Sequence, residues 1–232
     1  GTAVIARWLQ KYGYRVAVVP QPNWRDDLRD FRKLGAPRLY FGVNAGAMDS
    51  MVNHYTAAKR LRSDDAYTPE GKAGQRPDYA VTVYTRILKQ IYPDVPVIIG
   101  GIEASLRRVT HYDYWQDCLK KSILVDSKAD VLVYGMGEQP LTALCKAMQA
   151  KLQESGAEYM TAADAREITK EIRQTGYLAK KSDILIDCEH DKVLAPHSEC
   201  LADKAKQAAN FLAIEKESNK VNAKRLMQET PE

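Results

Sequence analysis

Val97-Ile98-Ile99-Gly100-Gly101 is the stretch that decides the fold, and it continues as Ile102-Glu103-Ala104-Ser105-Leu106-Arg107-Arg108. The continuous apolar run is typical of a buried strand, and two glycines end it. Glycine permits backbone conformations that other residues avoid, and it lets a second backbone or a ligand come close. Charged side chains are rarely buried without a partner, so their density after this strand indicates the wall of a binding or reaction site.

Short apolar runs and helical patterns alternate on both sides of this strand. The sequence predicts strands at 14–19, 38–43, 95–99 and 130–134, and helices at 23–34, 46–60, 77–92 and 140–152. Strands separated by helices form βαβ units, so we expect a Rossmann-like α/β fold with a parallel sheet and helices on both faces. The polar segment 61–77 is predicted to be a long loop, and loops of that length are often functional.

The pattern changes near residue 155. Thr161 and Asp164 predict the start of a helix, because they match a capping box. A strand is expected at 182–188 and a long helix, capped by Ser198, at 199–218. We therefore divide the chain into a Rossmann-like domain at 1–155 and a mixed α/β, helix-rich appendage at 156–232.

Composition narrows the class of protein. The 232 residues carry 34 Lys and Arg against 30 Asp and Glu, an excess too small to indicate nucleic-acid binding by itself. The sequence has neither an apolar run of about 18 residues nor a signal peptide, so we expect no membrane span. The chain begins with Gly1 rather than Met, and we expect it to be a piece of a longer protein. A reducing, cytoplasmic location suits its widely spaced cysteines, which are Cys118, Cys145, Cys188 and Cys200.

Polar and glycine residues follow three of the predicted strands, and ligands bind at the carboxyl edge of such sheets. The candidates are Asn44, Asp49, Asn53 and His54 after the second strand, Gly100, Gly101, Glu103, Ser105, Arg107, Arg108, His111 and Asp113 after the third, and Gly135, Gly137 and Glu138 after the fourth. We expect Glu103, Arg107, Arg108, His111 and Asp113 to line one cleft with Glu138.

Each candidate group also has a structural interpretation. Glu103 can pair with Arg107 or Arg108 merely to hold a turn. His111 and Asp113 are spaced for an oriented acid and base, although nearness in sequence does not prove a hydrogen bond. The glycines before Glu138 expose backbone N–H groups that could bind an anion or a ribose. In the structural interpretation, Glu138 only stabilises the first turn of a helix through the helix dipole.

Two cysteine–histidine pairs are candidate metal ligands. The pairs Cys188-x-His190 and His197-x-x-Cys200 have the ligand types of a zinc site. Their spacing is wrong for a zinc finger, and no cysteine cluster has the usual spacing for an iron–sulfur centre. We therefore predict no metal site and no cofactor in this chain.

Several long strings together resemble the YgiQ-type radical S-adenosylmethionine (SAM) proteins. They are Phe41-Gly42-Val43-Asn44-Ala45-Gly46-Ala47-Met48-Asp49 through Thr56, Asp64-Asp65-Ala66-Tyr67-Thr68-Pro69, Arg76-Pro77-Asp78, Gly100 through Arg108, His111-Tyr112-Asp113-Tyr114-Trp115, Ser122-Ile123-Leu124 and Ala129 through Glu138. The resemblance covers essentially the whole chain. It implies an N-terminal region similar to cobalamin-binding Rossmann-like domains, followed by a C-terminal radical SAM barrel that holds a [4Fe–4S] cluster and SAM. It assigns no cobalamin-ligating histidine here, because His54 and His111 occupy other loops.

The function that the resemblance implies is that of a non-catalytic domain, which presents a ligand or substrate to the barrel of the same chain. The substrate, a small molecule or RNA, is not identified by the sequence. A first alternative is an RNA recognition module with Arg60, Arg62, Arg76, Arg107 and Arg108 as phosphate contacts. A second alternative is a self-sufficient transferase or hydrolase with Glu103 or His111 as the base.

Overall fold

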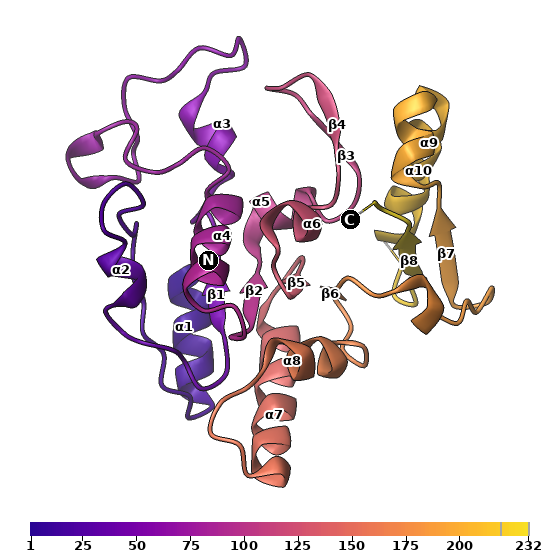
Figure 1. The fold of residues 1–232 in the computed structure, drawn as a ribbon. Helices are drawn as coiled ribbons and strands as arrows, with labels where there is room; N and C mark the ends of the chain where they lie inside the picture. Colours follow the sequence, from indigo (N-terminus) through magenta and orange to yellow (C-terminus); the bar gives the residue numbers. More distant parts are fainter. Residues whose placement is uncertain (219, 232) are drawn as a thin grey trace. The chain divides into compact units, whose positions relative to one another are not determined.

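The computed structural model describes residues 1–218 and 220–231 (Figure 1). These residues form two compact units. Unit 1 contains Gly1–Arg108 and Ile123–Leu178, and unit 2 contains Val109–Ser122 and Ala179–Glu232 within the described part. The units interleave along the chain, and residues 156–178 pack within unit 1. The division expected at residue 155 stays a prediction.

Unit 1 is built on a four-stranded sheet in the order β1-β2-β5-β6 (Figure 1). Its strands are β1 (Phe41–Val43), β2 (Val97–Ile99), β5 (Val131–Val133) and β6 (Thr175–Gly176). β1, β2 and β5 are parallel, and β6 is antiparallel to β5. All residues of β2 and β5 are buried, as expected for strands covered on both faces.

Helices cover both faces of this sheet. Val97 and Ile99 of β2 pack into one core with α4, whereas Ile98 packs into a second core with α7. The alternation follows from the two-residue period of a strand. The helices of unit 1 are α1 (Thr2–Lys11), α2 (Arg29–Arg32), α3 (Ser50–His54), α4 (Ala80–Ile91), α5 (Gly101–Leu106), α6 (Ile123–Ser127), α7 (Glu138–Ser155) and α8 (Ala162–Thr169), with a short 3₁₀ turn η1 (Pro69–Gly71). The predicted α/β fold with a mostly parallel sheet is thus confirmed.

The first third of unit 1 is less regular than predicted. The expected strand at 14–19 is wrong: this segment pairs with none of the described strands, and Val18 is exposed. Only α2 forms within the predicted helix 23–34. Asn23 Oδ1 accepts from Arg25 N, and Asp26 Oδ1 accepts from Leu28 N, so side chains hold the backbone in turns instead. The predicted helix 46–60 is reduced to α3, because the backbone becomes extended at Tyr55.

Unit 2 contains two separate two-stranded sheets. β3 (His111–Asp113) pairs with β4 (Cys118–Lys120) in an antiparallel hairpin, and β7 (Asp191–Leu194) pairs with β8 (Arg225–Gln228) in parallel. The strand expected at 182–188 does not form; the segment begins with a 3₁₀ turn η2 (Lys181–Asp183), and Leu185 is 91% exposed. The expected helix 199–218 is two helices, α9 (His197–Ala202) and α10 (Lys204–Ser218), because Asp203 is extended. None of the described helices has the length and apolarity that crossing a membrane requires.

Candidate functional site

Asp49 and Arg107 form a buried ion pair behind the carboxyl ends of β1 and β2. Asp49 caps α3: its Oδ1 accepts from Met51 N at 2.9 Å and from Val52 N at 3.3 Å. Its Oδ2 accepts from Arg107 Nη1, which also donates to the carbonyl of Glu103 at 3.1 Å. Both side chains are nearly inaccessible, so the pair joins the loop after β1 to α5 rather than facing a ligand.

Glu103 has a structural duty that its sequence neighbours do not reveal. It is 1% exposed, and its two carboxylate oxygens accept from Ser50 N at 2.9 Å and from Val81 N at 2.8 Å. These N–H groups belong to the first turns of α3 and α4, where helices leave backbone donors unsatisfied. Glu103 therefore joins two helix N-termini, and nothing in this geometry favours it as a general base.

The strand-end glycines are required by the backbone and by close packing within unit 1. Gly101 has φ +81° and Gly135 has φ +70°. Residues other than glycine rarely adopt this left-handed backbone region. A Cβ on Gly101 would lie 3.4 Å from Asn44 Cβ, and one on Gly100 would lie 3.3 Å from the Val133 carbonyl oxygen. Gly137 has no positive φ and would make only ordinary contacts. Intrachain packing thus accounts for these glycines without a nucleotide.

Asn44 and Arg108, two of the remaining edge candidates, contact other residues of unit 1. Asn44 Oδ1 accepts from Gly46 N at 2.8 Å and from the Thr2 hydroxyl at 3.1 Å. Arg108 donates to the Ser105 carbonyl at 2.8 Å and lies over the ring of Tyr134. The other two residues are Asn53, buried in α3, and Glu138, in the first turn of α7.

His111 and Asp113 lie in the β3–β4 hairpin of unit 2, so the expected cleft draws its residues from both units. His111 Nδ1 is 3.1 Å from the Val109 carbonyl oxygen. Asp113 Oδ1 accepts from Gln116 N at 2.9 Å, and its Oδ2 is 3.8 Å from Lys120 Nζ. These contacts fix the hairpin, and the shared cleft with Glu103 and Glu138 stays a prediction.

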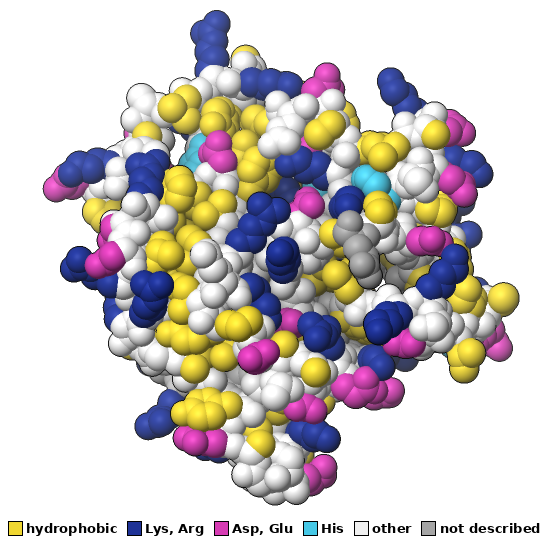
Figure 2. All heavy atoms as spheres, viewed as in Figure 1, with side chains coloured by type: hydrophobic (Ala, Val, Ile, Leu, Met, Phe, Trp, Pro, Cys, Tyr) yellow, Lys and Arg dark blue, Asp and Glu magenta, His cyan; other side chains and the backbone are white. Residues whose placement is uncertain are grey.

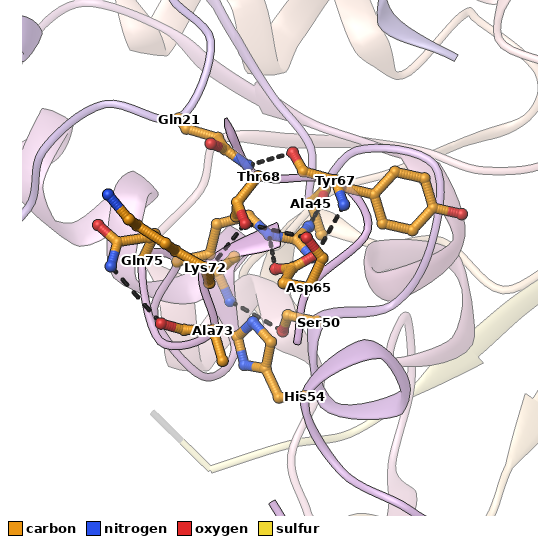
Figure 3. Close-up of polar contacts among 12 residues, drawn as sticks. Gln21, Ala45, Ser50, His54, Asp65, Tyr67, Thr68, Lys72, Ala73 and Gln75 are labelled. Atoms are coloured by element: carbon orange, nitrogen blue, oxygen red, sulfur yellow. Dashed lines mark hydrogen bonds and ion pairs between the residues drawn. The ribbon is translucent and has the colours of Figure 1, made fainter. Parts of the chain in front are cut away.

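A pocket of about 350 Å³ is lined mainly by the long connection between β1 and α4, and also by Trp24, Arg25 and Val83. This connection leaves the carboxyl end of β1 and includes the predicted loop 61–77. Of the predicted site residues, His54 lines the pocket, and Figure 3 shows its imidazole extending from α3 toward the part of the loop that carries Ala73. The wall also contains apolar groups, three arginines and three aspartates: Trp24, Leu61, Pro77, Val83, Arg25, Arg62, Arg76, Asp64, Asp65 and Asp78.

His54 is held in one orientation. Its Nδ1 is 2.8 Å from Asp78 Oδ1, and the Tyr55 hydroxyl donates to Asp78 Oδ2 at 2.7 Å. The hydrogen bond to Asp78 is also the main cause that raises the pKa of Tyr55. The His54 side chain is only 5% exposed, and its Nε2 atom is buried with no hydrogen-bond partner among the described residues. A buried polar atom of this kind calls for an explanation, and a ligand is one.

A second buried ion pair shapes the floor of the same pocket. Arg76 donates to Asp65 Oδ2 from Nε at 3.1 Å and from Nη2 at 2.9 Å, and it donates to the Ala45 carbonyl at 3.0 Å. Burial acts to raise the pKa of Asp65, but hydrogen bonds from Tyr67 N and from side chains that include Arg76 outweigh it and lower the pKa. The pair fixes the loop, because Asp65 also accepts from Tyr67 N (Figure 3).

Sequence reasoning missed Asp78, Tyr55 and Trp24 as site residues. Asp65 also lines the pocket, and it is only 2% exposed. The length and polarity of the loop were the signals that pointed here. The four cysteines are free thiols, and the described residues contain no group of three or more His, Cys, Asp or Glu side chains suited to a metal ion.

Comparisons with known proteins agree on one family. A family model described as "Radical SAM N-terminal" matches residues 1–232. UPF0313 proteins of Bacteroides thetaiotaomicron and Porphyromonas gingivalis are both 58% identical, over 99% and 98% of this chain and 37% and 34% of their own lengths. The UPF0313 protein YgiQ of Escherichia coli is 58% identical over 61% of this chain and 19% of its own length. No solved structure matches. The chain covers about a third of the first two relatives and about a fifth of the third, and it belongs to the radical SAM N-terminal family of UPF0313 proteins.

Proposed function

We propose that this chain is the ligand-holding region of a larger radical SAM enzyme, and that the β1–α4 pocket holds a small ligand for the catalytic region. The observation that carries the proposal is the buried, oriented imidazole of His54 in the pocket wall, with Nε2 unpartnered within the described part of the chain. Convergent polar groups in a pocket of this size are the usual features of a ligand site.

The residues of this chain do not fit a [4Fe–4S] cluster. Such a cluster needs several cysteines at one place, whereas Cys145 and Cys200 are buried in different units and Cys118 and Cys188 are exposed. We therefore place the cluster, SAM and the hydrogen abstraction in the C-terminal part that the longer relatives contain. Cobalamin has no histidine assigned to it here. Four free thiols are the reason to propose a reducing, cytoplasmic location.

Two sets of polar contacts hold the pocket wall in place. Asp78 and Tyr55 hold His54, and the Asp65–Arg76 pair holds the loop. Arg62 is exposed on the pocket wall, and none of the described residues pairs with its guanidinium. It is free to contact a ligand that enters from solvent.

The RNA alternative loses two of its five arginines, because Arg76 and Arg107 are buried in ion pairs. Figure 2 shows Lys and Arg side chains spread among Asp and Glu over the visible face, rather than gathered in one basic patch. The pocket favours a small ligand, and RNA is kept as an outcome of the tests.

The proposal is tested in the full-length enzyme with a reconstituted cluster, by measuring formation of 5′-deoxyadenosine from SAM. We expect fractions of a bacterial metabolite extract to increase this formation. Arg62→Ala should lose the increase, and Arg7→Ala, an exposed arginine of α1 outside the pocket, should keep it. An undiminished increase in the Arg62→Ala enzyme, or in one with the bulky change Ala73→Trp in the pocket wall, would contradict the proposal.

A further inference from the structure

We infer that the pocket takes a nucleoside unit whose base donates a ring N–H hydrogen bond to Nε2 of His54. This inference rests on the proposed function, since it names the chemistry of the ligand that the pocket holds. Three features carry it: the tautomer that Asp78 imposes on His54, the balance of charge around the pocket, and an exposed carboxylate in its wall.

With the His54 imidazole neutral, the ligand group that fits its Nε2 atom is a donor. An ionised Asp78 only accepts hydrogen bonds, so at 2.8 Å it takes the proton of Nδ1. In the neutral ring, Nε2 then carries a lone pair and accepts. A carboxylate or phosphate oxygen also carries lone pairs and would repel the lone pair of Nε2. An N–H or O–H group can donate a hydrogen bond to Nε2.

The part of the ligand next to His54 should be a neutral, largely apolar ring. Three arginines and three aspartates line the pocket, so their formal charges cancel. Trp24, Leu61 and Pro77 supply aromatic and apolar surface in the same wall. A volume of about 350 Å³ is at the small end of ligand pockets, which suits a single ring system with one substituent. Nucleobases combine an aromatic plane with ring N–H donors.

The substituent should carry hydroxyl groups. Asp64 lines the pocket and is exposed, and its carboxylate has no hydrogen bond or ion pair among the described residues. Carboxylates accept from ribose hydroxyls in nucleotide sites of α/β proteins. Arg62, also exposed on the pocket wall, can donate to ribose oxygens. A free nucleoside and a nucleotide at an RNA end share this chemistry.

The test is calorimetric binding to the full-length protein, with uridine, guanosine, 3-methyluridine and 1-methylguanosine as probes. The methyl groups replace the ring N–H and change little else. We expect uridine or guanosine to bind, and its methylated partner to bind about 10- to 100-fold more weakly, as a buried acceptor left unpaired predicts. Equal affinity within each pair, or no binding of any of the four probes, would overturn the inference.

Two further arms sharpen the result. The Asp78 side chain is 43% exposed, and Asp78→Asn should reduce the preference for the unmethylated probe. Asp94→Asn, at a position outside the pocket, should leave that preference unchanged. Tighter binding of the trinucleotide UpUpU than of uridine identifies an RNA end as the source, and equal or weaker binding identifies a free nucleoside. An extract that stimulates the enzyme through the pocket, with no preference for N–H probes, would refute the nucleoside and leave the proposed function standing.

Discussion

Replacement of Glu103 by Gln should destabilise unit 1 by about 1.5–3 kcal/mol. The carboxylate accepts from Ser50 N and Val81 N at 1% exposure. Glutamine keeps one oxygen, so one of the two N–H groups then faces an NH₂ group and loses its acceptor. A hydrogen bond to a charged group contributes roughly 1.5–3 kcal/mol. Glu103→Ala loses both acceptors and leaves a cavity, so its loss should be larger, roughly 3–6 kcal/mol.

The assay is urea unfolding followed by tryptophan fluorescence in a Trp115→Phe background, in which the remaining Trp8 and Trp24 both report on unit 1. The matched control is Glu154→Gln, in an exposed glutamate of α7, which should change the free energy of unfolding by less than about 0.5 kcal/mol. If Glu103→Gln unfolds like the control but abolishes activity of the full-length enzyme, the structural assignment is refuted and the catalytic-base alternative is restored.

Four other substitutions and one iron analysis test separate parts of the structure. Thr85→Val should raise the free energy of unfolding by about 1 kcal/mol, because the Thr85 hydroxyl is buried without a partner in the described part, and equal or lower stability in urea would contradict this. Asp65→Asn should cost about 3–5 kcal/mol near neutral pH by leaving Arg76 unpaired. The pKa of Asp65 is lowered from the ordinary value of 3.8, so the stabilisation by the Asp65–Arg76 pair is complete above that ordinary value. It is lost as pH falls through the folded pKa. Acidification below about pH 4 should therefore destabilise the wild type more than the Asp65→Asn variant. Gly101→Ala should lower the free energy of unfolding by about 1–2 kcal/mol, and Gly137→Ala should hardly change it. Equal changes in melting temperature for the two variants would refute the argument from positive φ. After anaerobic reconstitution, iron analysis of residues 1–232 should find no stoichiometric iron.

The central strands could be predicted because their signal is local. Val97–Ile99 and Val131–Val133 are continuous apolar runs between helical patterns, and the structure buries every one of these residues. Residues 14–19 have a similar composition, but no strand in the described part of the chain pairs with them, and composition does not encode such pairing. β6 has two residues, Thr175 and Gly176, which are too few to give any period.

Of the predicted site residues, only His54 lines the pocket, and the cleft expected around Glu103 and Glu138 stays a prediction. Glu103 and Arg107 were recognised as unusual, yet the partner of Arg107 is Asp49, 58 residues away along the chain. His54 was named without Asp78, because their pairing depends on how α3 meets the segment that leads into α4. Residue types thus indicated where charge is concentrated, whereas the three-dimensional fold decides which charges neutralise each other and which atoms remain for a ligand.

The hairpin β3–β4 leaves and re-enters unit 1 at adjacent points, because Ile123 N donates to the Arg107 carbonyl at 2.8 Å. Residues 109–122 are therefore topologically an insertion, and a few glycines and serines should be able to replace them without separating α5 from α6. A protease cut in this hairpin would divide unit 1 into two polypeptides that share one sheet, since β1 and β2 come from one piece and β5 from the other. The two pieces of such a nicked protein could be separated and mixed again. Their reassembly would depend on pairing between β2 and β5 and would therefore measure it.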